Sequence, residues 1–316
     1  MKKHKCLYCY QSLDRDETDF HSQCCQRFFG RRKTPELPYA LDQMLELARQ
    51  VLNTHKTVTG VQPKLSLGLS KGSSNDTPDR LTIVGLWGEF ILKPPSSSYP
   101  ELPELEGITM KLANQVGLKT VPHSLIRLAS GELAYITRRI DRPGKNILHM
   151  EDMCQLTGRL TEQKYNGSYE QIGRAIMQFS VNPGLDIVNF FEQVAFSFLT
   201  GNNDMHLKNF SLIKNIESGY GLCPAYDMVA SSLLIEDDNE ELALTLNARK
   251  RKISRQDFFA AGKTMKIPEK TIEGTIDSLL SKIASNLHLI KASFLTRSMQ
   301  QKFITLIKAR ISKLEK

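Results

Sequence analysis

The segment GNNDMHLKNFSLI, residues 201–213, concentrates side chains that can move a proton or bind a metal ion. Asp204 can accept a proton, whereas Asn209 and the later Asp227 offer the oxygen ligands that Mg²⁺ prefers. If two short strands pair antiparallel around a turn at 217–219, Asn209 at the start of the first lies close to Asp227. The sequence therefore predicts a proton acceptor beside a magnesium site.

The spacing from Asp204 to Asn209, Asp-x-x-x-x-Asn, is that of a protein-kinase catalytic loop. In such a loop the aspartate orients the substrate hydroxyl and accepts its proton, and the asparagine and a later aspartate hold Mg²⁺. The bare spacing is common, and Asn202, Asn203 and Asp204 could equally be turn and capping residues. The helix predicted before the loop and the hairpin predicted after it favour the kinase interpretation.

A kinase also needs groups that bind the phosphates of ATP, and candidates precede the loop in the expected order. Lys93 ends the strand-like segment FILKPP, and Glu106 lies in a predicted helix where it can pair with that lysine. Earlier still, KTVTGVQPK (56–64) fits a phosphate-covering loop loosely, because it lacks the pattern G-x-G-x-x-G. Each feature has a simpler alternative, namely a solvated lysine, a surface glutamate and an ordinary turn at Gly60, but their order favours ATP binding.

The catalytic loop follows a segment with the apolar pattern of a buried helix. Apolar side chains recur there at helical spacing, and the segment ends at Gly201, a common helix-ending residue. We therefore expect this helix to hold one end of the loop. The apolar stripe consists of Ile187, Phe191, Val194 and Phe198.

The remaining patterns predict an α+β, two-lobed protein-kinase-like fold with a β-rich N-lobe and a helical C-lobe. Alternating apolar residues over 57–93 predict β-hairpins, with the loop KGSSNDTPDR between them. A helix at 103–116 and strands up to about 139 follow, and helices are expected at 185–200, 254–261, 268–285 and 297–314. The expected divisions are a Cys/His-rich segment (1–33), the N-lobe (34–145) and the C-lobe (146–316).

These motifs, in this order, resemble those of the HipA family of serine/threonine kinases, the toxins of bacterial toxin–antitoxin modules. The resemblance implies a HipA-like fold, Asp204 as the catalytic aspartate, Asn209 and Asp227 as Mg²⁺ ligands and Lys93 as an ATP contact. It further implies that His206 structures the loop and that Lys208 helps to neutralise phosphate charge. The motifs that carry the resemblance are TGVQPKLSLGL, FILKPP, EDMCQL, KYNGSYEQIGRAIM, GNNDMHLKNFSLI, PAYDMV and LALTLNARKRK.

The resemblance also implies further ATP-binding and modified residues. Family members autophosphorylate serines in the phosphate-covering loop, and Thr57 and Thr59 stand at those positions here. Threonine keeps the hydroxyl, although its β-branching leaves the site of modification open. The phosphate-covering loop and the adenine-facing hinge would contribute Gly60, Val61, Gln62, Lys64, Arg138, Arg139 and Ile140.

The partners implied by the resemblance are proteins. Family members phosphorylate aminoacyl-tRNA synthetases, and the short stretch before the phosphate-covering loop resembles the HipT branch, which favours the tryptophanyl enzyme. In that branch a small HipS protein supplies a missing N-terminal piece and acts as antitoxin beside the DNA-binding HipB. We therefore expect HipS-like and HipB-like partners, with DNA contacted only indirectly through the latter.

Four residues near the N-terminus, Cys6, Cys9, His21 and Cys24, have the spacing C-x2-C-x11-H-x2-C. Two short chelating pairs separated by a loop are typical of a structural zinc site. The alternatives are partly buried free thiols and a nucleic-acid-binding zinc finger. The last is favoured only by the nearby basic residues Arg27, Arg31, Arg32 and Lys33.

The overall composition indicates a globular protein of 316 residues with a net charge of +8. The charge fits an anionic partner or simply a basic surface. Six cysteines in a chain of this length do not indicate a disulfide framework. We see no secretory signal and no apolar run of membrane-spanning length, and we expect a cytoplasmic protein. The rival functions are a catalytically inactive kinase-like binding module and a nucleic-acid-binding regulator that uses NARKRK (247–252).

Overall fold

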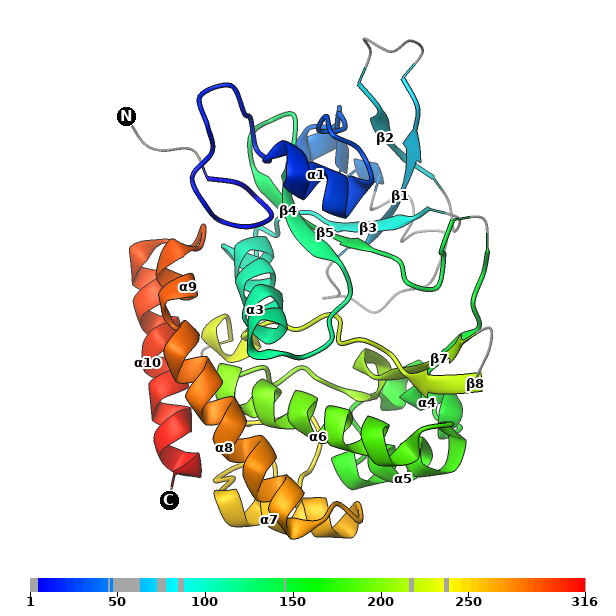
Figure 1. Ribbon diagram of the computed structural model, residues 1–316, viewed down its shortest axis with the longest axis vertical. Helices are drawn as coiled ribbons and strands as arrows, with labels where there is room; N and C mark the ends of the chain where they lie inside the picture. Colours follow the sequence, from blue (N-terminus) through cyan, green and yellow to red (C-terminus); the bar gives the residue numbers. More distant parts are fainter. Residues whose placement is uncertain are drawn as a thin grey trace. The chain divides into compact units, whose positions relative to one another are not determined.

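The structure is a computed structural model, in which residues 5–44, 46–47, 63–72, 78–84, 88–144, 146–215, 219–235 and 239–315 are described. The chain divides into two compact units, each of which has its own sheet (Figure 1). The first unit comprises Met1–Gly107, Val121–Asn146 and Ala292–Phe294, and the second comprises Ile108–Thr120, Ile147–Lys291 and Leu295–Lys316. The predicted limits 1–33, 34–145 and 146–316 stay a prediction.

The described strands of the first unit form a five-stranded antiparallel sheet in the order β2-β1-β3-β5-β4. The hairpin prediction is confirmed for β1 and β2, which pair on either side of the loop after Ser70. Phe90 and Leu92 of β3 are fully buried, as alternation in a half-buried strand requires. The strands are β1 (Leu65–Ser70), β2 (Arg80–Ile83), β3 (Phe90–Lys93), β4 (His123–Arg127) and β5 (Leu133–Arg138).

Helices α1 and α3 accompany this sheet. Helix α1 (Ser22–Phe29) places Phe28 and Phe29 against Phe90 of β3, with ring centroids 5.8 Å apart in both pairs. Helix α3 (Leu102–Val116) follows β3, and its second half, from Ile108, is grouped with the second unit. The sheet is thus supported by aromatic packing close to the strand that ends at Lys93.

The second unit is mainly helical, and α6 (Pro183–Thr200) is its central helix. The predicted apolar stripe of α6 is buried throughout, and the helix contacts α5, α8 and α10. The helices expected at 254–261, 268–285 and 297–314 are present, whereas α5 was not predicted. The other helices are α4 (Met153–Leu156), α5 (Tyr169–Phe179), α7 (Arg255–Thr264), α8 (Glu269–Asn286), α9 (His288–Ala292) and α10 (Arg297–Leu314).

A small antiparallel sheet, β6-β7-β8, completes the second unit. The hairpin expected after the polar loop is present as β7 and β8, but the prediction that Asn209 begins its first strand is wrong. Asn209 instead ends a short 3-10 helix, η2, because its side-chain oxygen accepts a hydrogen bond from the His206 N–H and closes a tight turn. The bounds are β6 (Met150–Asp152), η1 (Thr161–Gln163), η2 (Leu207–Asn209), β7 (Ser211–Asn215), β8 (Gly219–Leu222) and η3 (Ser231–Leu233).

Among the described residues, no helix combines the length and the apolar character that crossing a lipid bilayer requires.

Candidate active site

The polar loop begins where α6 ends, at a glycine that the geometry requires. Gly201 has a φ of 69°, in the left-handed region that glycine adopts without strain. Its backbone N–H bonds to the carbonyls of Phe198 and Ser197, which terminates the helix. A side chain here would also collide with Ser232 and with Leu306 of α10. The exit direction of the loop is therefore set by packing against these neighbours.

Asn202 and Asn203 shape the loop. The side-chain oxygen of Asn202 accepts a hydrogen bond from the backbone N–H of Asp204, at 3.3 Å. The backbone N–H of Asn203 donates to the Ser231 hydroxyl at 3.1 Å, and that hydroxyl donates to the Asn203 side-chain oxygen at 2.6 Å. The first residues of the loop are thus tied to η3, and the side-chain oxygens of both asparagines accept hydrogen bonds that hold the loop.

Asp204 is partly exposed and is held by a tyrosine that the sequence reasoning did not single out. The Tyr165 hydroxyl donates a hydrogen bond to the Asp204 carboxylate, with 2.5 Å between the oxygens. Tyr165 is itself 41% exposed. The Tyr165 hydroxyl thus occupies a hydrogen-bonding position on the Asp204 carboxylate that the hydroxyl group of another molecule could otherwise take.

His206 is buried, only 7% exposed, in the middle of the loop. Burial lowers the pKa of its imidazole most strongly, Lys164 lowers it further, and Asp204 and Asp227 raise it, for a result of about 4. The ring is therefore neutral at pH 7. It packs edge-on against Tyr165, with centroids 5.0 Å apart. The buried ring thus packs against Tyr165, and both Asp204 and Asp227 act on its pKa.

Asn209 and Asp227 are brought together by Tyr226. The Tyr226 hydroxyl donates to the carbonyl of Lys208 at 3.1 Å and shares a 2.5 Å hydrogen bond with the Ser211 hydroxyl. This ties the residue before Asp227 to the residue before Asn209. Asp227 has a φ of 59°, a conformation that aspartate tolerates better than most residues.

The second unit therefore gathers Asp204, Asn209 and Asp227 around His206. Asn209 is buried and its side-chain oxygen accepts one hydrogen bond, which leaves a second lone pair on that oxygen. Asp227 adds a partly exposed carboxylate. These hard oxygen donors fit Mg²⁺.

Lys208 lies beside this group and forms an ion pair outside it. Its Nζ donates to the Asp152 carboxylate at 2.9 Å. Asp152 also caps α4 by accepting the N–H of Gln155. The charge of Lys208 is thus paired within the protein.

In the first unit, Lys93 and Glu106 form a buried ion pair. The distance from Nζ to Oε1 is 2.6 Å, and the residues are 3% and 1% exposed. Strand β3 ends at Lys93 and helix α3 supplies Glu106, so the pair joins the two elements. The Lys93 ammonium also lies 5.4 Å from the centre of the Tyr135 ring, which adds a cation–π contact.

The predicted hinge residues lie at the end of β5, where Arg138 is the last residue of the strand, and directly after it. The backbone N–H groups of Arg138 and Arg139 donate to the carbonyls of Pro122 and Glu89. The Arg139 guanidinium binds the Asp141 carboxylate through two hydrogen bonds, of 3.0 and 2.6 Å. Ile140, in the following turn, is half-buried.

Several predicted residues lie outside the described part of the chain, and one lies at its margin. Lys64 is exposed and directly precedes β1. Thr57, Thr59, Gly60, Val61 and Gln62 lie outside the described residues.

The family model of the HipA-like C-terminal domain matches residues 56–287 of this chain, which is well over half of the sequence. The chain belongs to this family. Its curated relatives include a putative kinase of Haemophilus influenzae, 33% identical over 68% of this chain and 64% of that protein. They also include the serine/threonine-protein kinase toxin HipA of Shewanella oneidensis, 28% identical over 60% of this chain and 46% of that protein. The HipA-like chain thus matches roughly half to two thirds of the length of these relatives.

Solved structures establish the fold of this HipA-like chain. HipA from the Shewanella oneidensis complex of HipA, HipB and operator DNA superposes with a TM-score of 0.68 at 20% identity, over 96% of this chain and 74% of that one. The Helicobacter pylori proinflammatory kinase CtkA superposes with a TM-score of 0.52 at 15% identity, over 79% of this chain and 93% of that one. The predicted α+β, kinase-like fold is confirmed.

The sequence reasoning missed the tyrosines that organise the HipA-like loop. Tyr165 binds Asp204, Tyr226 binds the Lys208 carbonyl, and the buried hydroxyl of Tyr169 donates to the carbonyl of Met205 at 3.1 Å. Tyr165 and Tyr169 lie in the motif KYNGSYEQIGRAIM and Tyr226 lies in PAYDMV. The motifs carried the signal, but no spacing rule links a tyrosine to a loop so distant in sequence.

Proposed function

We propose that this protein is an ATP- and Mg²⁺-dependent serine/threonine protein kinase that acts as the toxin of a bacterial toxin–antitoxin module. The observation that carries the proposal is the buried Lys93–Glu106 ion pair. Burying two charges is costly, so such a pair is weak evidence for stability alone. A lysine at a strand end paired with a helical glutamate is, however, what a protein kinase requires to bind ATP phosphates.

The proposed reaction transfers the γ-phosphoryl group to a protein hydroxyl. Asp204 would orient the hydroxyl and take its proton while the hydroxyl oxygen forms a bond to phosphorus and the bond to the ADP oxygen breaks. Lys93, held by Glu106, would bind phosphate oxygens of ATP. Asn209 and Asp227 would hold Mg²⁺, which supplies neutralisation of phosphate charge. His206 would support the loop as a neutral ring.

The basic test is phosphate incorporation from labelled ATP. The wild-type protein should label itself when Mg²⁺ is present, and Asp204→Asn should abolish labelling while preserving the size and shape of the side chain. Glu273→Gln, an exposed change on α8, is the matched control and should leave labelling unchanged. If the wild-type protein neither labels itself nor binds ATP, the kinase proposal is refuted and a catalytically inactive, kinase-like binding module is favoured instead.

Autophosphorylation would fall on Thr57 or Thr59, as the family resemblance implies. The proposal predicts a phosphothreonine between residues 56 and 64 after incubation with ATP. Peptide mass spectrometry of the wild-type and Asp204→Asn proteins would locate it. Phosphate found only elsewhere in the chain would exclude this part of the proposal.

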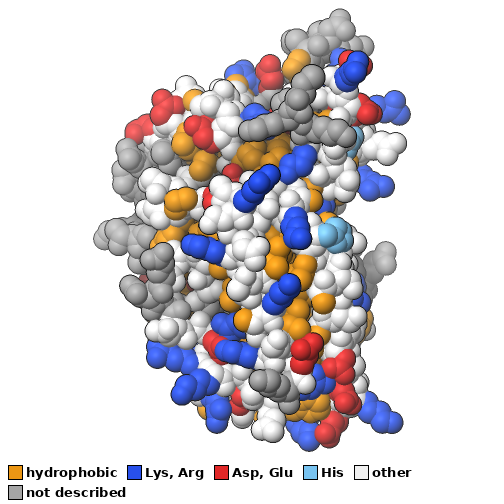
Figure 2. Space-filling model, turned by 90° about the vertical axis from the view of Figure 1, so that its left-hand side faces the viewer, with side chains coloured by type: hydrophobic (Ala, Val, Ile, Leu, Met, Phe, Trp, Pro, Cys, Tyr) orange, Lys and Arg blue, Asp and Glu red, His pale blue; other side chains and the backbone are white. Residues whose placement is uncertain are grey.

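The proposed substrate is an aminoacyl-tRNA synthetase, and the HipT-like resemblance favours the tryptophanyl enzyme. The net charge of +8 supports attraction to an anionic partner. Figure 2 shows lysine and arginine side chains on the face it presents, between hydrophobic and uncharged ones. Phosphoproteomics of cells that express wild-type protein or Asp204→Asn would identify the substrate, and a set of phosphosites without any synthetase would refute this choice.

We also propose HipS-like and HipB-like antitoxin partners in the cytoplasm. The related HipA of Shewanella oneidensis was solved in a complex with HipB and its operator DNA, which supports the second partner. Affinity purification of the tagged protein from its own cells should recover both. A salt-sensitive DNA mobility shift by the purified chain alone would instead favour direct DNA binding and the regulator interpretation.

A further inference from the structure

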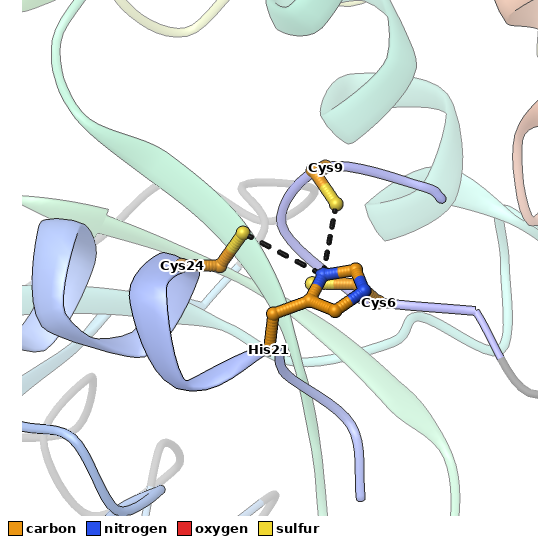
Figure 3. Close-up of side chains that lie close together, drawn as sticks. All are labelled: Cys6, Cys9, His21 and Cys24. Atoms are coloured by element: carbon orange, nitrogen blue, oxygen red, sulfur yellow. Dashed lines mark hydrogen bonds between the residues drawn. The ribbon is translucent and has the colours of Figure 1, made fainter. Parts of the chain in front are cut away.

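Four potential metal ligands meet in the N-terminal segment of the first unit. One ligand atom from each of Cys6, Cys9, His21 and Cys24 lies within 4.8 Å of all the others (Figure 3). Cys6 and Cys24 are buried, and Cys9 and His21 are half-buried. The sequence reasoning left this group open between zinc, free thiols and a nucleic-acid-binding finger, and the kinase proposal does not use it.

The imidazole of His21 is oriented as a ligand. Its Nε2 lies 3.0 Å from the carbonyl oxygen of Ser12, which can only accept a hydrogen bond, so Nε2 carries the proton. The lone pair then resides on Nδ1, which lies 3.3 Å from the Cys9 sulfur and 3.8 Å from the Cys24 sulfur. A histidine ligand whose other nitrogen donates to a carbonyl is a regular feature of protein metal sites.

The two nitrogen–sulfur separations are close to those of a tetrahedral zinc site. Zinc lies about 2.3 Å from a thiolate sulfur and about 2.0–2.1 Å from an imidazole nitrogen. At a tetrahedral angle these bond lengths place sulfur and nitrogen about 3.6 Å apart, and two sulfurs about 3.8 Å apart. The observed nitrogen–sulfur distances of 3.3 and 3.8 Å lie on either side of the first value.

The backbone also has the form of a site built from two chelating pairs. The first pair lies in a tight turn, closed by the Tyr10 N–H bonding to the Cys6 carbonyl at 2.9 Å, with Tyr10 at a φ of 69°. The second pair lies at the start of α1, where His21 is the N-cap residue and Cys24 belongs to the first turn. The positive end of the helix dipole favours a thiolate at that position.

We propose that Cys6, Cys9, His21 and Cys24 bind one structural Zn²⁺ ion. Three soft sulfur ligands with one imidazole select zinc over Mg²⁺ or Ca²⁺, which prefer oxygen ligands. All four coordination positions come from the protein, so the site is closed and has no open position for a substrate. The site is separate from the residues proposed for phosphoryl transfer, and it does not depend on that proposal.

The zinc site stabilises the N-terminal segment and helix α1, which pack against the β-sheet of the first unit. The site fixes the start of α1, and α1 carries Phe28 and Phe29 onto Phe90 of β3. Leu7, between the first two ligands, accepts a hydrogen bond through its carbonyl from the Leu125 N–H of β4, at 3.4 Å. The metal therefore joins the N-terminal segment to two strands of the sheet, and its loss should destabilise this unit.

The first test is the metal content of the full chain, purified without added metal or chelator. Native mass spectrometry and elemental analysis should find one zinc ion per chain, and X-ray absorption should show three sulfur ligands and one nitrogen ligand. Co²⁺ in place of zinc should give the visible absorption bands of a tetrahedral thiolate site. Absence of zinc, or a disulfide between these cysteines in freshly purified protein, would overturn the proposal.

Variants give the second test, with a control on the same helix. Cys9→Ala and His21→Ala alter half-buried ligands and should each lose the zinc ion and lower the melting temperature. Cys25→Ala alters a fully buried cysteine next to Cys24 that is not part of the group, and it should keep the zinc ion. Zinc retained by the first two variants but lost by Cys25→Ala would refute the ligand assignment. These readouts do not involve kinase activity.

Discussion

The Lys93–Glu106 pair allows stability and activity to be separated. Removing one partner of a buried pair leaves an uncompensated charge and costs about 3–5 kcal/mol. Because both residues are almost fully buried and their charged atoms are only 2.6 Å apart, we expect Lys93→Met and Glu106→Leu to fall in that range. Replacing both with apolar residues is often neutral or stabilising, so the double variant should recover most of the loss.

Urea unfolding of the four proteins provides the double-mutant cycle. The chain has two compact units, so far-UV circular dichroism should be combined with a probe of the first unit. Hydrogen exchange of the backbone amides of the paired strands β1, β3 and β5 provides that probe. A double variant whose destabilisation equals the sum of the two single variants would refute the reasoning that the pair is coupled.

Activity should not follow stability in this series. A kinase lysine is needed for its phosphate contact, so the double variant should be folded and yet fail to label itself with ATP. Labelling by a folded Lys93→Met protein would show that the pair has only a structural role. It would thereby remove the observation on which the kinase proposal rests.

Three further changes test individual features of the second unit. Tyr165→Phe removes a hydroxyl that competes with the substrate hydroxyl for the Asp204 carboxylate. Since a hydrogen bond contributes about 1 kcal/mol, the rate of labelling should rise about fivefold. A fall in this rate would show that Tyr165 instead positions Asp204. Gly201→Ala should destabilise the protein by about 2 kcal/mol or more in urea unfolding, because alanine is strained in the left-handed backbone conformation and its methyl group would collide with Ser232 and Leu306. Gly184→Ala is the control, since the added methyl group meets no neighbouring atom and should not destabilise the protein. Hydrogen bonds from Asn247 and Ser254 outweigh burial and lower the pKa of Asp257 below its ordinary 3.8. The ionised Asp257 carboxylate therefore stabilises the folded protein at neutral pH, and this contribution is lost as the pH falls through the folded-state pKa. Asp257→Asn should therefore lower stability at pH 7 by about 1–3 kcal/mol and flatten the acid end of the stability profile, and an unchanged profile would contradict this assignment.

The strongest sequence predictions concerned elements with regular apolar periodicity. The stripe of α6 and the hairpin of β1 and β2 were predictable because burial on one face leaves a repeat of 3.6 or 2 residues in the sequence. Helix α5 was missed. The start of β7 was misplaced by two residues, since the side chain of Asn209 closes a turn where strand pairing was expected. Side-chain capping of this kind leaves no periodic signal.

The sequence by itself determined the types and the order of the candidate site residues, namely a lysine, a helical glutamate, the loop with Asp204 and Asn209, and Asp227 after a hairpin. It also determined the spacing of the Cys/His group, because chelating pairs must be close along the chain. Only the tertiary structure decided which contacts hold these residues in place. Tyr165 and Tyr226 reach the loop from distant segments, Ser231 ties down Asn203, and Ser12 sets the proton on His21. Such contacts arise from folding in three dimensions, and no local pattern encodes them.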